Sequence, residues 1–187
     1  MALVAAPPRS AIVRVAEIAL LAAVADVALA LRLGWTPSLP AYLFLGAVCA
    51  AVSVVDATTR RIPNRIVLPA YPVGGLLLAF AAASDGAWSA LVRAALGMAV
   101  LGGFYLLLAE VLPGQMGFGD VKLAGLLGLF LGFAGWPAVA TGALLASVLA
   151  LISLAGRRAL GGGSGRVTIA FGPYLCLGAL VAVLLAR

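Results

Sequence analysis

Residues 136–156, WPAVATGALLASVLALISLAG, decide the class of fold. The stretch has no charged side chain, comes close to the ~20 residues that an α-helix needs to cross a bilayer, and is followed by Arg157 and Arg158. Similar apolar runs recur along all 187 residues, of which 65% are hydrophobic and only 10% are charged. A water-soluble domain carries roughly a quarter charged residues. The sequence therefore predicts an all-α, polytopic transmembrane bundle that forms a single membrane-embedded domain over residues 1–187.

Breaks rich in glycine, proline or charge divide the chain into about seven predicted transmembrane helices. We expect them at about residues 11–33, 40–55, 66–84, 88–110, 120–134, 136–156 and 168–186. The second and fifth are short for a full crossing, which predicts local thinning or a water-filled notch there. The first run follows Arg9 and Arg14 and so resembles a signal peptide, whose cleavage would leave six helices. We favour a retained helix because Glu17 and Asp26 interrupt the run, which is also long for a signal sequence.

The basic residues predict the orientation of these helices in the cytoplasmic membrane. With the N-terminus in the cytoplasm, nine of the 12 Lys and Arg residues fall on the inner side, as the positive-inside rule requires. These nine are Arg9, Arg14, Arg60, Arg61, Arg65, Lys122, Arg157, Arg158 and Arg166. The outer side then holds Arg32, Arg93 and Arg187.

Composition also bears on partners and cofactors. The net charge of +6 is spread between apolar runs and not gathered in one stripe, so we expect contacts with membrane lipid and none with nucleic acid. The chain has no histidine, and Cys49 and Cys176 both lie inside apolar runs, so a zinc site is not supported. The glycine-rich residues 161–165 lack the lysine of a phosphate-binding loop and are expected to be a flexible link. We expect no cofactor and no metal.

Two of the six acidic residues stand out by position. Asp56 closes the second predicted helix and Asp120 opens the fifth, and the two helices between them lead the chain out and back. Both carboxylates should therefore lie on the same side, the cytoplasmic one. Two facing carboxylates in a poorly hydrated site share a proton, as in aspartic peptidases. By spacing alone, the simpler interpretation is that Asp56 is a boundary residue and Asp120 a helix N-cap.

The other acids receive local explanations. Glu17 follows Arg14 by three residues, which predicts an ion pair on one helix face. Asp26 and Arg93 should share a depth in the membrane, and we expect them to pair between the first and fourth helices. Asp85 belongs to a short outer turn, and Glu110 is expected to be solvated at the cytoplasmic face.

Three stretches of the sequence carry recognisable motifs. Residues 117–123, GFGDVKL, contain a GxGD pattern followed by a hydrophobic residue and a lysine, and so resemble the type IV prepilin peptidases. Residues 56–64, DATTRRIPN, are similar to the family's first aspartate, short basic loop and Ile-Pro-Asn turn, and residues 171–175, FGPYL, resemble the Gly-Pro element of its last helix. All three occur in the family's order. The resemblance covers about residues 40–187 and leaves 11–33 as an additional N-terminal helix.

The resemblance implies an aspartic endopeptidase of the cytoplasmic membrane with Asp56 and Asp120 as catalytic residues. Its substrates would be type IV prepilins or pseudopilins, which serve type IV pili and protein secretion, and it would remove their basic leader at the cytoplasmic face. Larger members of the family also N-methylate the product through a domain with paired CxxC motifs. Residues 34–40 are too few to hold that domain, so methyltransferase activity is not expected. The compact archaeal preflagellin peptidases are the nearest variant, and oligomeric state is left open.

Residues around the two aspartates have expected roles as well. Gly117 and Gly119 remove side chains, so that a substrate backbone can approach near Phe118 and the loop can adopt positive φ. Pro173 should lie about five residues inside the last helix, next to Gly172, and expose backbone groups to a substrate; a plain kink is the alternative.

Three further residues are expected to support the site. Pro63 should fix a turn and Asn64 should cap the third helix. Lys122 should reach the interface or lipid head groups.

Two other classes of function compete with the peptidase. A small carrier or channel would use Asp56 and Asp120 to bind ions or protons, but no matched broken helices appear in the two halves. A catalytically inactive factor for pilus or secretion assembly is the second alternative.

Overall fold

The computed structural model describes residues 9–111, 117–159 and 170–186, and this part of the chain contains α-helices and no strand. The seven helices are α1 (Arg9–Leu33), α2 (Leu39–Thr59), α3 (Asn64–Asp85), α4 (Trp88–Val111), α5 (Phe118–Ala134), α6 (Trp136–Ala159) and α7 (Gly172–Leu185). Four of the described helices have stretches long and apolar enough to cross a membrane: α2, α3, α4 and residues Trp136–Gly156 of α6. The predicted all-α, polytopic class is confirmed.

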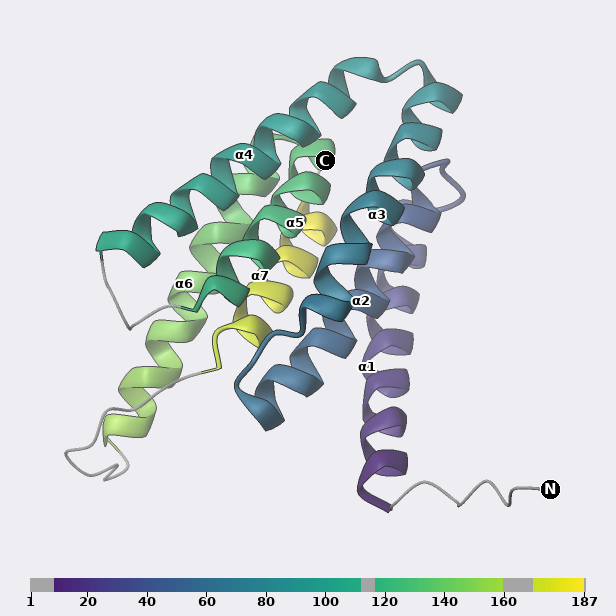
Figure 1. The fold of residues 1–187 in the computed structure, drawn as a ribbon. Helices are drawn as coiled ribbons and strands as arrows, with labels where there is room; N and C mark the ends of the chain where they lie inside the picture. The colour runs from purple at the N-terminus through teal and green to yellow at the C-terminus, as the bar shows by residue number, and fades with distance from the viewer. Residues whose placement is uncertain (1–8, 112–116, 160–169, 187) are drawn as a thin grey trace.

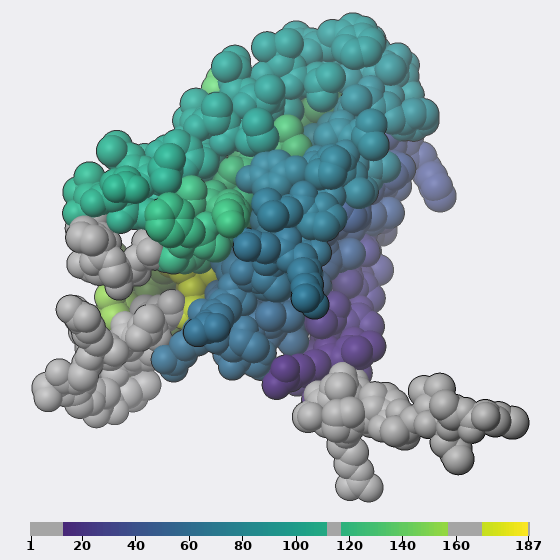
Figure 2. Space-filling view, in the orientation of Figure 1, coloured from purple at the N-terminus to yellow at the C-terminus, as the bar shows by residue number. Residues whose placement is uncertain are grey.

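The helices run up and down in one bundle (Figure 1). α4 packs along α5, α6 along α7, and α1 along α2, with α1 at one edge. Buried leucines and Phe130 of α5 form much of the core, together with Leu45 of α2 and Leu78 of α3. α4, which covers much of the face seen in Figure 2, keeps Leu96, Val100, Phe104 and Leu107 about half exposed. Such an apolar exterior suits lipid as its solvent.

Glycines bring α4 and α5 into backbone contact. A Cβ at Gly97 of α4 would lie 2.5 Å from the carbonyl oxygen of Gly128, and one at Gly132 would lie 2.5 Å from the carbonyl oxygen of Arg93. A Cβ at Gly102 would lie 3.3 Å from the Cα of Gly125. Small residues at such spacings are the usual means of close helix packing in membranes. They fix α5 firmly to α4.

Two helix boundaries differ from those expected and change how the motifs are placed. α2 continues to Thr59, four residues beyond the predicted end, and has 21 residues, so it is not short. It ends where Arg60 adopts the left-handed conformation (φ 52°) and its N–H bonds to the carbonyl of Asp56. α7 begins at Gly172 and not near residue 168, so Pro173 lies in the first turn. A proline there removes no helical hydrogen bond, and the predicted break inside the last helix is wrong. α5, with 17 residues, is as short as expected.

Candidate active site

Asp56 lies in the last turn of α2 and is the only buried polar or charged residue in the described part of the chain, at 4% exposure. The backbone N–H of Gly172, the first residue of α7, donates a hydrogen bond of 2.9 Å to its Oδ2. A buried carboxylate without such a donor would cost considerable free energy, so this contact accounts for its place in the interior. A Cβ added to Gly172 would lie only 2.7 Å from the same oxygen. The glycine is therefore required for the approach of α7 to Asp56.

Asp120 has a different, local environment. It is the third residue of α5, and its Oδ2 accepts a hydrogen bond of 3.2 Å from the backbone N–H of Gly117. Gly117 is the N-cap residue and Asp120 lies three residues after it, so the alternative in which Asp120 is the N-cap residue is wrong. Gly117 has φ −86° and ψ 145°, an extended conformation open to any residue, and the expected positive φ is absent from this described loop residue. Phe118 is 63% exposed and contributes little to the interior.

The connection between α2 and α3 holds the start of α5. A Cβ on Gly119 would lie 2.9 Å from the Cβ of Ile62, so Gly119 permits close packing against this connection. The ammonium group of Lys122 donates a hydrogen bond of 3.1 Å to the side-chain oxygen of Asn64, a contact that the sequence did not predict. Asn64 is the first residue of α3 and Pro63 its N-cap, so the predicted capping by Asn64 is wrong.

These contacts gather the two aspartates at the same end of the bundle. The end of α2, the start of α5 and the start of α7 all lie there in Figure 1. The ring of buried Tyr105, on α4, lies 5.9 Å from that of Phe171. Sequence reasoning missed Tyr105. The only signal for it was its spacing of four residues from Leu101, which places the two residues on the same face of α4.

The two carboxyl groups, one buried and one partly exposed, can share a proton and act as acid and base on a water molecule. Among the described residues, no group of three or more His, Cys, Asp or Glu side chains is close enough to hold a metal ion.

The expected pair of Asp26 and Arg93 does not form. Arg93 donates hydrogen bonds of 2.8 and 2.9 Å to the carbonyl oxygens of Gly132 and Phe133 at the end of α5. The carboxyl of Asp26 faces Gly46, and its Oδ1 is buried without a described partner. The reason is the arrangement of helices, because α4 packs on α5 whereas α1 packs on α2 and α7.

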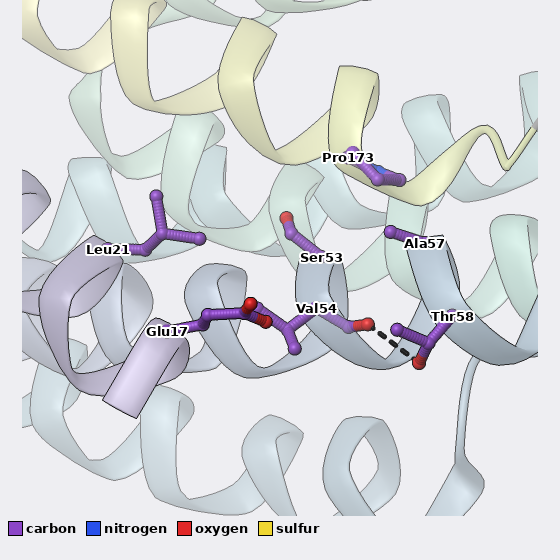
Figure 3. A pocket seen from close by; sticks show the side chains of 7 residues that line it. All are labelled: Glu17, Leu21, Ser53, Val54, Ala57, Thr58 and Pro173. Atoms are coloured by element: carbon purple, nitrogen blue, oxygen red, sulfur yellow. Dashed lines mark hydrogen bonds between the residues drawn. The ribbon is translucent and has the colours of Figure 1, made fainter. Parts of the chain in front are cut away.

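A hollow of about 260 Å³ lies between α1, α2 and α7, beside Asp56. Figure 3 shows Glu17 extending from α1 toward Val54 on α2, with Ser53, Ala57 and Pro173 around it. No sequence pattern indicated this hollow, because its walls come from three separate segments. Among the described residues, the expected ion pair between Glu17 and Arg14 does not form.

Comparison with known proteins gives consistent results. Residues 42–154 match the model of the type IV leader peptidase family. A prepilin leader peptidase/N-methyltransferase of Aeromonas hydrophila is 32% identical over 169 residues, which cover 88% of this chain and 56% of that protein. The protein of the same description from Pseudomonas putida is 36% identical over 141 residues, or 72% of this chain and 46% of that protein. The chain thus spans about half the length of these curated relatives. No solved structure matches significantly.

Proposed function

The chain belongs to the type IV leader peptidase family, and from this we propose that it removes the basic leader of type IV prepilins or pilin-like secretion proteins, with Asp56 and Asp120 as the catalytic pair. One observation carries the proposal. Carboxylates from two different helices lie at one end of the bundle, and each accepts a hydrogen bond from a glycine N–H: Gly172 for Asp56 and Gly117 for Asp120. A carrier or channel site gives no reason for such paired, close glycine contacts.

In the proposed reaction the pair carries one proton. Asp120 lies in the first turn of α5, where the helix dipole favours a negative charge, so we assign it the ionised state. Its carboxylate takes a proton from water as the water oxygen bonds to the scissile carbonyl carbon, while the carboxylic acid of Asp56 gives its proton to the carbonyl oxygen. The tetrahedral intermediate then returns a proton to Asp56, the C–N bond breaks, and Asp120 protonates the leaving amine. The cycle ends with the original single proton on the pair.

We propose that this chemistry takes place at the cytoplasmic face of the cell membrane. The excess of basic residues on the side of the two aspartates supports this orientation. A substrate helix must unwind locally to expose a peptide bond, and the partly exposed position of Asp120 leaves access for water.

We further propose that the chain acts as a peptidase without methyltransferase activity. The curated relatives are described as both peptidases and N-methyltransferases. The segment between α1 and α2, from Gly34 to Ser38, is too short for a domain. Mass spectrometry of a processed substrate should therefore find an unmethylated new N-terminus, and a methylated one produced by the purified chain would contradict this.

The test of the peptidase is co-expression with a candidate prepilin. The wild type should process the leader, whereas Asp56→Ala, Asp120→Ala and the corresponding asparagine variants should not, because none of them can exchange the required proton. Asp85→Asn, a change of the same kind on the exposed turn at the other end of α3, is the matched control. Retained processing by either aspartate variant would rule out the mechanism. Loss of ion transport with intact processing would favour a carrier.

A further inference from the structure

Two neighbouring hollows follow α2 away from Asp56. The first, of about 260 Å³, contains Glu17 and lies next to Gly172, since Pro173 is one of its walls. The second, of about 400 Å³, lies between α1, α2 and α7 and is almost entirely apolar. Leu21, Ser53 and Pro173 line both hollows, which are therefore adjacent. We refer to the two together as the groove; Ala57, next to Asp56 in α2, lines its first part.

The groove has the length and character of a seat for an apolar helix. On α7 it is lined from Pro173 to Leu184, eleven residues apart, which corresponds to roughly 16 Å along a helix axis. It opens outward between Val24 on α1, which is 63% exposed, and Leu177 on α7, which is 48% exposed. A helix lying there would keep its other side in contact with lipid.

The end of the groove beside Asp56 carries a negative charge. Glu17 is exposed, and no hydrogen bond or ion pair to another described residue occupies its carboxylate. It is the only charged side chain among the residues that line either hollow. The hydroxyl of Thr58, in the same wall, bonds to the carbonyl of Val54 in its own helix and leaves Glu17 free (Figure 3).

We propose that this groove binds the substrate of the proposed reaction, with its apolar helix along α1, α2 and α7 and a basic residue of its leader paired with Glu17. The inference rests on the proposed function. An acidic end followed by an apolar channel complements a peptide in which positive charge precedes an apolar helix. Asp56 is the neighbour in α2 of Ala57, which lines the acidic end. A phospholipid would place its phosphate near Glu17, where like charges repel. Glu17 is thus a specificity-determining residue.

The first test compares Glu17→Gln with Glu110→Gln, the same change on an exposed acid at the end of α4 that lines neither hollow. Glu17→Gln should lower kcat/KM for a prepilin with its basic leader about three-fold, and Glu17→Lys about ten-fold, as expected for an exposed charge pair. Replacing the leader's basic residue with glutamate should restore cleavage by Glu17→Lys. The effect should weaken in high salt. Equal rates for wild type and Glu17→Lys, or no rescue, would overturn the assignment of Glu17.

The second test locates the substrate helix. A photo-crosslinking amino acid at Leu177, in the groove, should capture the prepilin, whereas one at Leu107, exposed on α4, should not. The inactive Asp120→Asn background keeps the substrate intact during the experiment. Capture at Leu107 alone, or capture of lipid alone at Leu177, would overturn the groove as the substrate site. If the wild type cleaves no prepilin at all, the proposed function itself fails, and that outcome is distinct from both of the others.

Discussion

The two aspartates differ in what holds them in place. Asp56 is buried and bonded to a glycine 116 residues away, so its position depends on the packing of α7 against α2. Asp120 is partly exposed and bonded to a glycine three residues away, with Ile62 and Asn64 bracing the helix that carries it. One carboxylate is set by tertiary structure and the other by a local turn. A single site therefore has two separate ways of being disturbed.

The largest effect should come from removing either proton-exchanging group while keeping its shape. Asp56→Asn and Asp120→Asn should each lower kcat by on the order of 100- to 10,000-fold, as expected for general acid–base catalysis. Despite their different surroundings, the two losses should be similar, because one proton is shared by both. Leader cleavage by purified protein in detergent measures this. A loss confined to one aspartate would mean that the residues do not act as a pair.

The next largest effect should come from a substitution that displaces Asp56 and leaves Asp120 in place. Gly172→Ala places a Cβ 2.7 Å from Oδ2 of Asp56 and should lower kcat about 10- to 100-fold by displacing that carboxylate. Gly75→Ala, on α3, meets no atom within 4 Å and is the matched control. Similar activities for the two variants would show that the contact between α7 and Asp56 has no role in the site.

The position of Asp120 should depend instead on the contact between Gly119 and Ile62. Gly119→Ala places a Cβ 2.9 Å from the Cβ of Ile62 and should lower kcat about ten-fold. Adding Ile62→Gly removes the Cβ that the new methyl group at position 119 would meet and should restore part of the loss, and a double-mutant cycle measures the coupling between the two positions. Additive losses would contradict the packing explanation.

The smallest effect should come from the polar contact at the exterior. Lys122→Met removes the hydrogen bond to Asn64 and should lower kcat/KM about two- to five-fold, as expected for one such bond near the surface. Asn64→Ala should have the same effect, and the double variant should lose no more than either single one. A loss near that of Asp120→Asn would instead give Lys122 a part in the reaction.

Much of this arrangement could be predicted from the sequence. Apolar runs and their breaks locate seven helices, and the even number of crossings between Asp56 and Asp120 predicts a common end. The end of α2 was misplaced because polar residues usually stop a membrane helix. Here the hydroxyl of Thr59 bonds back to the carbonyl of Val55, which lets the helix continue past Asp56.

Contacts across the bundle were out of reach of sequence reasoning. Gly172 touches Asp56 only because α7 and α2 are neighbours, which no local pattern reveals. The glycine-proline pair at residues 172 and 173 does carry a usable signal, since proline is favoured in the first turn of a helix. Interpreted as a helix start, and not as a kink, it predicts the observed beginning of α7. Arg93 was assigned to Asp26 by depth alone, and depth cannot tell which helices are adjacent.

The bonds from Arg93 to the end of α5 have a consequence for the opposite end of that helix. The guanidinium group of Arg93 bonds to the last carbonyls of α5, the glycines of α4 contact the middle of α5, and Ile62 contacts its first turn. Because these contacts are spread along α5, they oppose movement of the helix along its own axis. The position of Asp120 along the bundle axis therefore depends on contacts at the far end of α5, roughly 25 Å away along the 17 residues of the helix. Under the proposed function, a change at Arg93 would shift Asp120 relative to the scissile bond, although Arg93 and Asp120 lie at opposite ends of α5.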